Sequence, residues 1–365
     1  MAIVITLLEP FSYTVGQGEA VEREKKRKAN FVGSDPSCDG AAIPAIAVLY
    51  SGGCYTRSQM WRDLLGAQRF GLAWLLGLAV VSTTVSAQVA DKKTSPPCSQ
   101  CQVWNTPQEP FRVFGNTYYV GPHGLSSILI VSSTGHVLID GALPESVPQI
   151  VQNIKSLGFR IEDVKLIVNS HVHFDHAGGL AELQRLSGAR VVASPWSAEV
   201  LRKGGVGIGD PQYGEVRPIR RVAHVETLKD GESFHAGEVV VTAHLTPGHT
   251  PGGTSWTWQS CLEGRCLNMV YADSLSAISA KGFRFSDSRA HPNALKDFET
   301  SFAFFSTVPC DVLLTTHPEN GNLWEKLEAR RRGVTPDPMS DPGACRSLAD
   351  GAREQLKRRL AEEAR

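Results

Sequence analysis

The stretch Ser170–Gly179 reads SHVHFDHAGG and places four metal-binding side chains within six residues. His171 and His173 are two residues apart, so in an extended segment they project to the same side. Asp175 and His176 follow where the chain is expected to turn into a helix. Imidazole nitrogens and carboxylate oxygens are ligand types that zinc accepts in proteins. This one short loop is therefore predicted to supply ligands to two adjacent metal ions.

Two further histidines follow predicted strands, as the first motif does. The strand predicted over 164–168 (VKLIV) leads into the first motif, the strand over 239–245 leads to His249 in TPGHT, and the strand over 311–316 leads to His317 in TTHP. Because open α/β sheets place their sites at strand ends, we expect these histidines to converge at one edge of a sheet. The remaining histidines are interpreted as surface or hydrogen-bonded core residues, namely His123, His136, His224, His235, His244 and His291.

The sequence between these motifs alternates between helix and strand signals. Helices are predicted over 145–157, 180–186, 197–202, 292–307 and 347–364, where apolar residues recur at helical spacing or a long amphipathic run continues. Further strands are predicted over 126–131, 136–140, 190–194, 254–258 and 267–272. With no internal repeat at a short period, this mixture predicts two sheets with helices outside, in one domain over residues 88–365.

A secretory signal is predicted over residues 60–87. Arg62 and Arg69 supply positive charge, 70–81 (FGLAWLLGLAVV) is the apolar core, and the small residues at 85–87 precede a mature start near Gln88. The alternative of a membrane anchor is disfavoured because this apolar run is short for a bilayer span. Since a signal peptide acts at the N-terminus, we interpret 1–59 as a non-native or disordered extension and place the start of translation at Met60.

Composition and cysteine usage agree with an exported globular protein. Lys plus Arg and Asp plus Glu both count 37, so the formal net charge is zero and no field attracts nucleic acid or an anionic membrane. Six cysteines follow the signal, and an oxidising compartment favours disulfides. Nearness suggests Cys98–Cys101 and Cys261–Cys266, which leaves Cys310 with Cys345. The number of cysteines alone does not establish which of them pair. The alternative to disulfides is a structural zinc ribbon.

The motifs HVHFDHAGG, TPGHT and TTHP resemble the metal motifs of the metallo-β-lactamase superfamily. The resemblance runs from about Phe111 to the C-terminal helix. It implies an α/β fold, a four-layer αββα sandwich with the site between the loops of the two sheets. It also implies two Zn²⁺ ions, the first held by His171, His173 and His249 and the second by Asp175, His176 and His317.

A subclass is indicated by the stretch 271–277 (YADSLSA), which lacks the cysteine that binds the second zinc in the commonest β-lactamase subclass. It resembles the third subclass of class B enzymes, in which His176 takes the place of that thiolate. The runs SWTWQSC at 255–261 and GACR at 343–346 resemble the same subclass, whose C-terminal disulfide matches Cys310–Cys345. Ser274 and Ser276 match serines that this family uses near the substrate carboxylate, although packing at a strand end is the alternative for both.

The activity that this resemblance implies is hydrolysis of the β-lactam amide bond in penicillins, cephalosporins and carbapenems, which confers antibiotic resistance. Zinc brings the pKa of bound water to about 7, which makes a nucleophile available at neutral pH. Asp175 is predicted to bind zinc and to orient that nucleophile, as the catalytic residue. We expect a periplasmic monomer that acts on a small β-lactam, with no nucleic acid partner and no membrane attachment after signal cleavage.

Other functions occur on this fold, so the fold alone does not establish the activity. A secreted lactonase or thioesterase would use a bridging aspartate before the last histidine, and Asp273 is the candidate, although the YADSLSA stretch favours a supporting role for it. A glyoxalase II would also need a longer C-terminal helical region. The absence of a basic stripe disfavours a nuclease. Two adjacent metals with room for water disfavour a protein that only stores zinc.

Overall fold

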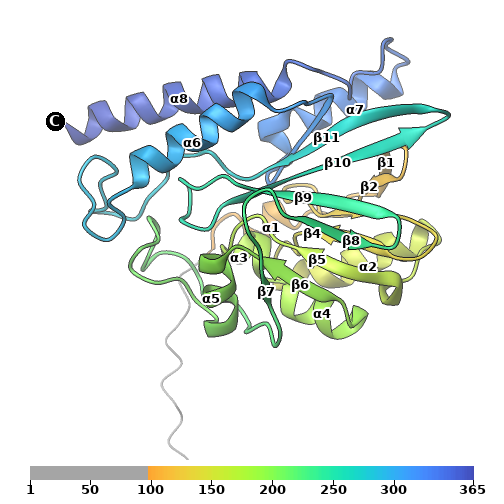
Figure 1. Ribbon diagram of the computed structural model, residues 1–365, viewed down its shortest axis with the longest axis horizontal. Helices are drawn as coiled ribbons and strands as arrows, with labels where there is room; N and C mark the ends of the chain where they lie inside the picture. Colours follow the sequence, from red (N-terminus) through yellow and green to blue (C-terminus); the bar gives the residue numbers. More distant parts are fainter. Residues whose placement is uncertain (1–97) are drawn as a thin grey trace, which may run out of the picture. The chain divides into compact units, whose positions relative to one another are not determined.

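The computed structural model describes residues 98–365, so the predicted extension and signal peptide lie outside the described residues. Two β-sheets pack face to face and helices cover both outer faces, which gives four layers (Figure 1). This arrangement confirms the predicted αββα sandwich. No helix within residues 98–365 combines the length and the apolar run needed to cross a membrane.

The first sheet has seven strands in sequence order. They are β1 (Phe111–Phe114), β2 (Thr117–Tyr119), β3 (Ile128–Ile130), β4 (His136–Ile139), β5 (Val164–Val168), β6 (Arg190–Ala193) and β7 (Glu226–Thr227). Strands β1 to β4 are antiparallel, and β4 to β7 are parallel. The parallel half carries the crossover helices.

The second sheet has five strands in the order β12-β11-β10-β9-β8. They are β8 (Ser233–Ala236), β9 (Val239–Leu245), β10 (Thr254–Leu262), β11 (Arg265–Ala272) and β12 (Val312–Thr315). Strand β12 pairs parallel with β11, whereas the other pairs are antiparallel. This parallel pairing directs the ends of β11 and β12 to the same edge.

The helices divide between the two outer faces. On the first sheet lie α2 (Val147–Ser156), α4 (Leu180–Ser187) and α5 (Pro195–Lys203), and on the second lie α6 (Ala294–Thr307) and α8 (Ala344–Glu363). Shorter elements are α1 (Cys101–Trp104), α3 (Phe174–Ala177), η1 (Pro144–Ser146), η2 (Ile161–Asp163) and η3 (Pro318–Gly321), and α7 (Leu323–Arg331) packs against the core between the sheets.

The core follows from the period of two in the strands. In β5, Leu166 and Val168 belong to the cluster between the sheets, whereas Ile167 packs with the helices on the outer face. Successive side chains of a strand point to opposite faces, so a strand buried on both sides needs a run of apolar residues. In β5 this run is Leu166–Val168, and only Lys165 is exposed. This burial fixes the position at which β5 ends and the histidine motif begins.

One prediction about the site's frame is wrong. The three strands that lead to histidines do not belong to one sheet, because β5 lies in the first sheet while β9 and β12 lie in the second. The site therefore lies at an edge that the two sheets share.

The strand β10 is longer than predicted. It runs to Leu262, because a two-residue turn with positive φ at Glu263 and Gly264 closes a hairpin there.

Four short strands and the helix α7 were not predicted from the sequence. The strands β1, β2, β7 and β8 have two to four residues each, too few to establish a periodicity. The helix α7 reads LWEKLEARR and buries only Leu323 and Leu327, so its apolar pattern is weak. The predicted disulfides Cys98–Cys101, Cys261–Cys266 and Cys310–Cys345 are all formed, which makes the zinc-ribbon alternative wrong.

We predict that the double substitution Cys310→Ser and Cys345→Ser lowers the free energy of unfolding more than Cys261→Ser with Cys266→Ser. The first bond joins residues 35 apart and the second joins residues five apart. Loop-closure entropy gives about 4 and about 2 kcal/mol respectively. Urea unfolding of both variants and of the wild type checks this order. Equal losses would show that loop length does not control these two contributions.

Candidate metal centre

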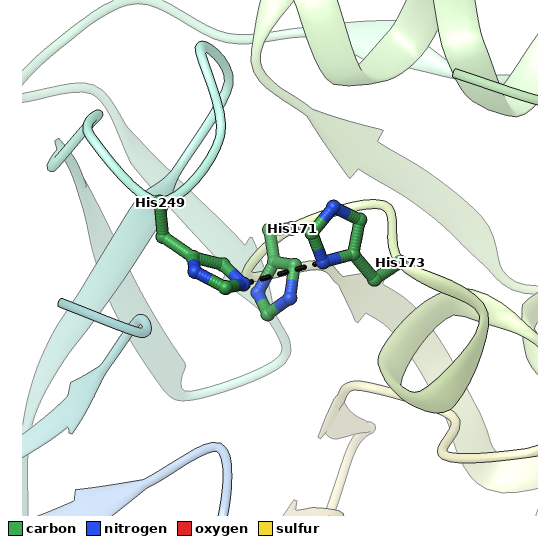
Figure 2. Close-up of side chains that lie close together, drawn as sticks. All are labelled: His171, His173 and His249. Atoms are coloured by element: carbon green, nitrogen blue, oxygen red, sulfur yellow. Dashed lines mark hydrogen bonds between the residues drawn. The ribbon is translucent and has the colours of Figure 1, made fainter. Parts of the chain in front are cut away.

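Three buried histidines converge from the two sheets. His171 and His173 follow β5, and His249 lies in the loop after β9. Figure 2 shows their imidazole rings turned toward one another, with His249 Nε2 3.2 Å from His173 Nδ1. The ring centroid of His171 lies 4.8 Å from those of the other two. The ligand atoms of this three-histidine group lie within 4.8 Å of one another.

A second group lies beside the first. Asp175 and His176 belong to α3, and His317 follows β12. The Oδ2 atom of Asp175 lies 3.2 Å from His176 Nε2 and 3.5 Å from His317 Nε2. The ring centroids of His171 and His176 are 4.4 Å apart, so the two groups are neighbours. All six residues predicted as metal ligands are thus brought together by the fold.

The nitrogen atoms of the first group are arranged as in a metal-binding site. His171 Nδ1 lies 2.7 Å from Asp273 Oδ1, and His249 Nδ1 lies 2.9 Å from the carbonyl oxygen of Ser276. Each ring thereby commits one nitrogen to an oxygen atom and directs the other into the three-histidine group, which is the usual arrangement around metal-binding histidines. The Nε2 atom of His171 is buried without a hydrogen-bond partner. Buried polar atoms rarely lack a partner, so the residues present fit zinc.

Burial also sets the charge states that a cation requires. Desolvation, reinforced by neighbouring histidines, holds the pKa of His171 well below its usual range and lowers the pKa of His249 to about 3. Both rings are therefore neutral and can ligate a metal. Burial alone would raise the pKa of Asp175, but the charge of His176 and the contacts with His176 and His317 hold it well below its usual range. The carboxylate is ionised.

A buried carboxylate that sequence reasoning missed secures the first histidine motif. Asp140 follows β4 with a positive φ of 58° and is fully buried. It accepts hydrogen bonds from Ser170 N at 2.8 Å, Ser170 Oγ at 2.6 Å, Asn169 Nδ2 at 3.0 Å and Tyr271 Oη at 2.8 Å. These bonds fix the segment that immediately precedes His171. The available signal was an acidic residue at the end of an apolar strand, which reads like an ordinary turn.

Two more carboxylates lie behind the histidines. Asp273 contacts His171 through the nitrogen opposite the free Nε2, so it lies behind this ligand, as the sequence favoured. Asp210, from the glycine-rich loop 204–214, lies 3.1 Å and 3.2 Å from His173 Nε2 through its two oxygens. Sequence reasoning missed Asp210 because this loop also fits a plain connector. Only the folded chain brings it to His173.

A cavity of about 640 Å³ opens over both groups. Ser274 and Ser276 line it, with their hydroxyl oxygens 2.9 Å apart and Ser276 Oγ 3.1 Å from His249 Nδ1. Trp104 from the N-terminal segment and Gln212 from the glycine-rich loop form further parts of the wall. The cavity is therefore polar where the metal ligands lie and is enclosed by segments distant in sequence.

We predict that Asp140→Ala lowers the free energy of unfolding of the metal-free protein by about 3 kcal/mol or more. The substitution leaves several buried donors unpaired, and each costs roughly 1–3 kcal/mol. Denaturant unfolding in the presence of a chelator measures this loss without a contribution from metal binding. Asp287→Ala, at an exposed position, is the matched control and is expected to change little. An Asp140→Ala protein as stable as the wild type would contradict the role of this carboxylate.

One family model and two solved structures relate this chain to metallo-beta-lactamases. The family model of the metallo-beta-lactamase superfamily matches residues 120–261. Among solved structures, the chain is 57% identical to Rm3 metallo-beta-lactamase, with a TM-score of 0.72 over 74% of this chain and 100% of that chain. It is 54% identical to MEM-A1, a subclass B3 metallo-beta-lactamase isolated from a soil metagenome library, with a TM-score of 0.70 over 72% of this chain and 98% of the other.

Curated relatives are more distant. The uncharacterized protein YobT of Bacillus subtilis (strain 168) is 29% identical over 148 residues, which are 38% of this chain and 59% of that protein. A hydroxyacylglutathione hydrolase of Bradyrhizobium sp. (strain ORS 278) is 31% identical over 117 residues, which are 32% of this chain and 36% of that protein. The chain thus spans less than two thirds of the length of these curated relatives.

Proposed function

This chain belongs to the metallo-β-lactamase superfamily as a subclass B3 enzyme, and on that premise we propose that it hydrolyses the amide bond of β-lactams with two bound zinc ions. The observation that carries the proposal is the pair of adjacent buried ligand groups at the floor of one cavity. His171, His173 and His249 would hold one ion, and Asp175, His176 and His317 the other. Penicillins, cephalosporins and carbapenems are the proposed substrates.

The chemistry that zinc supplies is a bound water with a pKa of about 7 and polarisation of the carbonyl oxygen. The chain's own residues position the reactants. Asp175 lines the cavity as an ionised carboxylate, so it can accept a hydrogen bond from the attacking water and hold it toward the carbonyl carbon. Asp273 and the carbonyl oxygen of Ser276 keep the rings of His171 and His249 in fixed orientations.

The substrate carboxylate is proposed to bind at Ser274 and Ser276. Their hydroxyl groups face each other across 2.9 Å in the cavity wall beside His249, where two donors can reach one carboxylate. A hydroxyl is a donor as well as an acceptor, so both can turn toward an anion when it enters. The polar wall would orient the β-lactam so that its ring carbonyl lies over the ligand groups.

Export to the periplasm and a role in antibiotic resistance are further parts of the proposal. Three disulfides among the described residues favour an oxidising compartment. The signal peptide at 60–87 would direct the protein to the periplasm, where it would act as a monomer. Residues 1–59 would be absent from the exported protein. N-terminal sequencing of protein purified from a periplasmic extract is expected to start near Gln88, and peptides from 1–59 would contradict this.

We predict rapid hydrolysis of a carbapenem by the zinc-loaded protein, followed by absorbance, and its loss when a chelator removes the metal. His173→Ala is expected to abolish turnover because it removes a proposed ligand, while the disulfides and the core retain the fold. The control is Asp287→Ala, at an exposed position. Undiminished activity of His173→Ala would refute its role.

Absence of carbapenem turnover in a folded protein with two zinc ions would favour the second candidate, a lactone or thioester hydrolase. The similarity to a hydroxyacylglutathione hydrolase over 117 residues is the observation behind this candidate. Turnover of S-acylglutathione would then support it. The position of Asp273 behind His171 speaks against a metal-bridging aspartate of the thioesterase type.

We further predict that Ser276→Ala raises KM for a β-lactam by roughly 10- to 100-fold and changes kcat little. Loss of a hydrogen bond to a charged group costs about 1.5–3 kcal/mol, and loss of binding that is equal in ground and transition states raises KM alone. The backbone carbonyl that holds His249 persists in the variant. Ser279→Ala, which does not line the cavity, is the control. An unchanged KM would assign Ser276 to strand-end packing.

A further inference from the structure

An unusual carboxylate lies in the glycine-rich loop 204–214, which follows α5. Five of its eleven residues are glycines. Ile208 and Tyr213 are 71% and 52% exposed, as expected for a surface loop, yet Asp210 between them is wholly buried. Burying a carboxylate is costly unless it is paired and hydrogen-bonded. Within residues 98–365 its ion-pair partner is His173, and its other side-chain contact is with the backbone N–H of Gln212 at 2.8 Å.

This contact orients His173 differently from the other two histidines of its group. His171 and His249 use Nδ1 for their oxygen partners, whereas His173 directs Nε2 to Asp210 and turns Nδ1 toward His249. A carboxylate oxygen accepts hydrogen bonds, so the imidazole proton is held on Nε2. The lone pair of Nδ1 then faces His249 Nε2 at 3.2 Å and Gln212 Nε2 at 3.4 Å. The acceptor for this ring comes from the glycine-rich loop, whereas the acceptors for His171 and His249 come from the segment that follows β11.

The same loop contributes to the cavity wall. Gln212 and, just beyond the loop, Val216 line the cavity together with His173. The loop has few neighbours, because a Cβ atom added at Gly205, Gly207 or Gly214 would meet nothing within 4 Å. Segments with few packing contacts open at low free-energy cost. The position of this wall therefore depends on a small number of anchors, among them the buried Asp210 and the buried Pro211, whose carbonyl oxygen accepts a hydrogen bond from Ala280 N at 2.8 Å.

We propose that Asp210 is a positioning residue that couples the loop 204–214 to the metal centre, so that zinc in the three-histidine group and the ordered loop stabilise each other. A metal ion held by the three histidines would fix the ring of His173 and thereby the position of Asp210, which faces its Nε2 atom. The coupling is reciprocal, since a loop that stabilises bound zinc is stabilised by zinc to the same extent. The inference rests on the metal site of the proposed function and not on its substrate.

The test compares Asp210→Ala, Asp210→Asn and the wild type, without substrate. Zn²⁺ affinity is measured by competition with a chromophoric chelator, and amide hydrogen exchange of 204–217 is followed with and without zinc. In the wild type, zinc is expected to slow exchange of the loop. Asp210→Ala is expected to lower affinity for one zinc about 10- to 100-fold and to abolish the effect of zinc on the loop. Asp210→Asn keeps an acceptor oxygen and should lie between.

Glu215→Gln is the matched control, because Glu215 is an exposed carboxylate near the loop that contacts the backbone of Lys281 and no histidine. It should bind zinc as the wild type does. Cobalt-substituted protein adds a signature that a purely structural role would not change, since the visible bands should shift in both Asp210 variants and not in Glu215→Gln. If Asp210→Ala unfolds without metal, the test uses the Zn²⁺ affinity of Asp210→Asn and the visible spectrum of its cobalt-substituted form.

Wild-type zinc affinity in both Asp210 variants, or a wild-type loop whose exchange ignores zinc, would overturn the coupling. These readouts are independent of turnover. A protein that shows the coupling and hydrolyses no β-lactam would refute the proposed function alone. A β-lactamase with zinc-insensitive loop exchange would refute this inference alone.

Discussion

The two sheets are pinned together at the edge where the ligand groups lie, and the geometry of the site depends on this contact. Trp256, fully buried in β10, donates its indole N–H to the carbonyl oxygen of Asn169 at 3.1 Å, and Thr254 N donates to Ser170 O at 2.9 Å. On the other side, Ser126 N donates to Thr316 O at 2.9 Å. These bonds hold the segments just before His171 and His317 against the opposite sheet. Without them the two sheets could slide, and the six ligands would separate.

Charge balance explains why so many acidic side chains lie inside the molecule. Asp175 lines the cavity, and Asp140, Asp210 and Asp273 are buried behind it. Burial raises the pKa of Asp140 and of Asp273, so these carboxylates are disfavoured as anions when no cation is near. Divalent cations at the ligand groups would offset this cost. The four carboxylates together match the charge of two such ions.

The sequence predicted most of the strands and helices, and it singled out the six residues that the fold brings together as two groups, because this information is local. Four of the ligands share one loop, and the other two follow apolar runs such as 239–245 that are identifiable as strands. It could not predict that β12 joins the second sheet, because its parallel pairing with β11 is made between residues 43 apart, as at Met269 and Val312. The two carboxylates that contact the histidines also differ in how far the sequence reveals them. Asp273 stands in a recognisable stretch, whereas Asp210 meets His173 only after folding.

The glycine-rich loop has a consequence for how such an enzyme can evolve. Its neighbours leave open space at Gly205 and Gly207, and neither requires a left-handed backbone. New side chains can therefore accumulate there without repacking the core, on the same loop that supplies Gln212 to the cavity wall. The ligands are held by the buried edge of two sheets, where most substitutions are costly. Substitutions can thus change this loop while the buried edge that holds the two ligand groups stays the same.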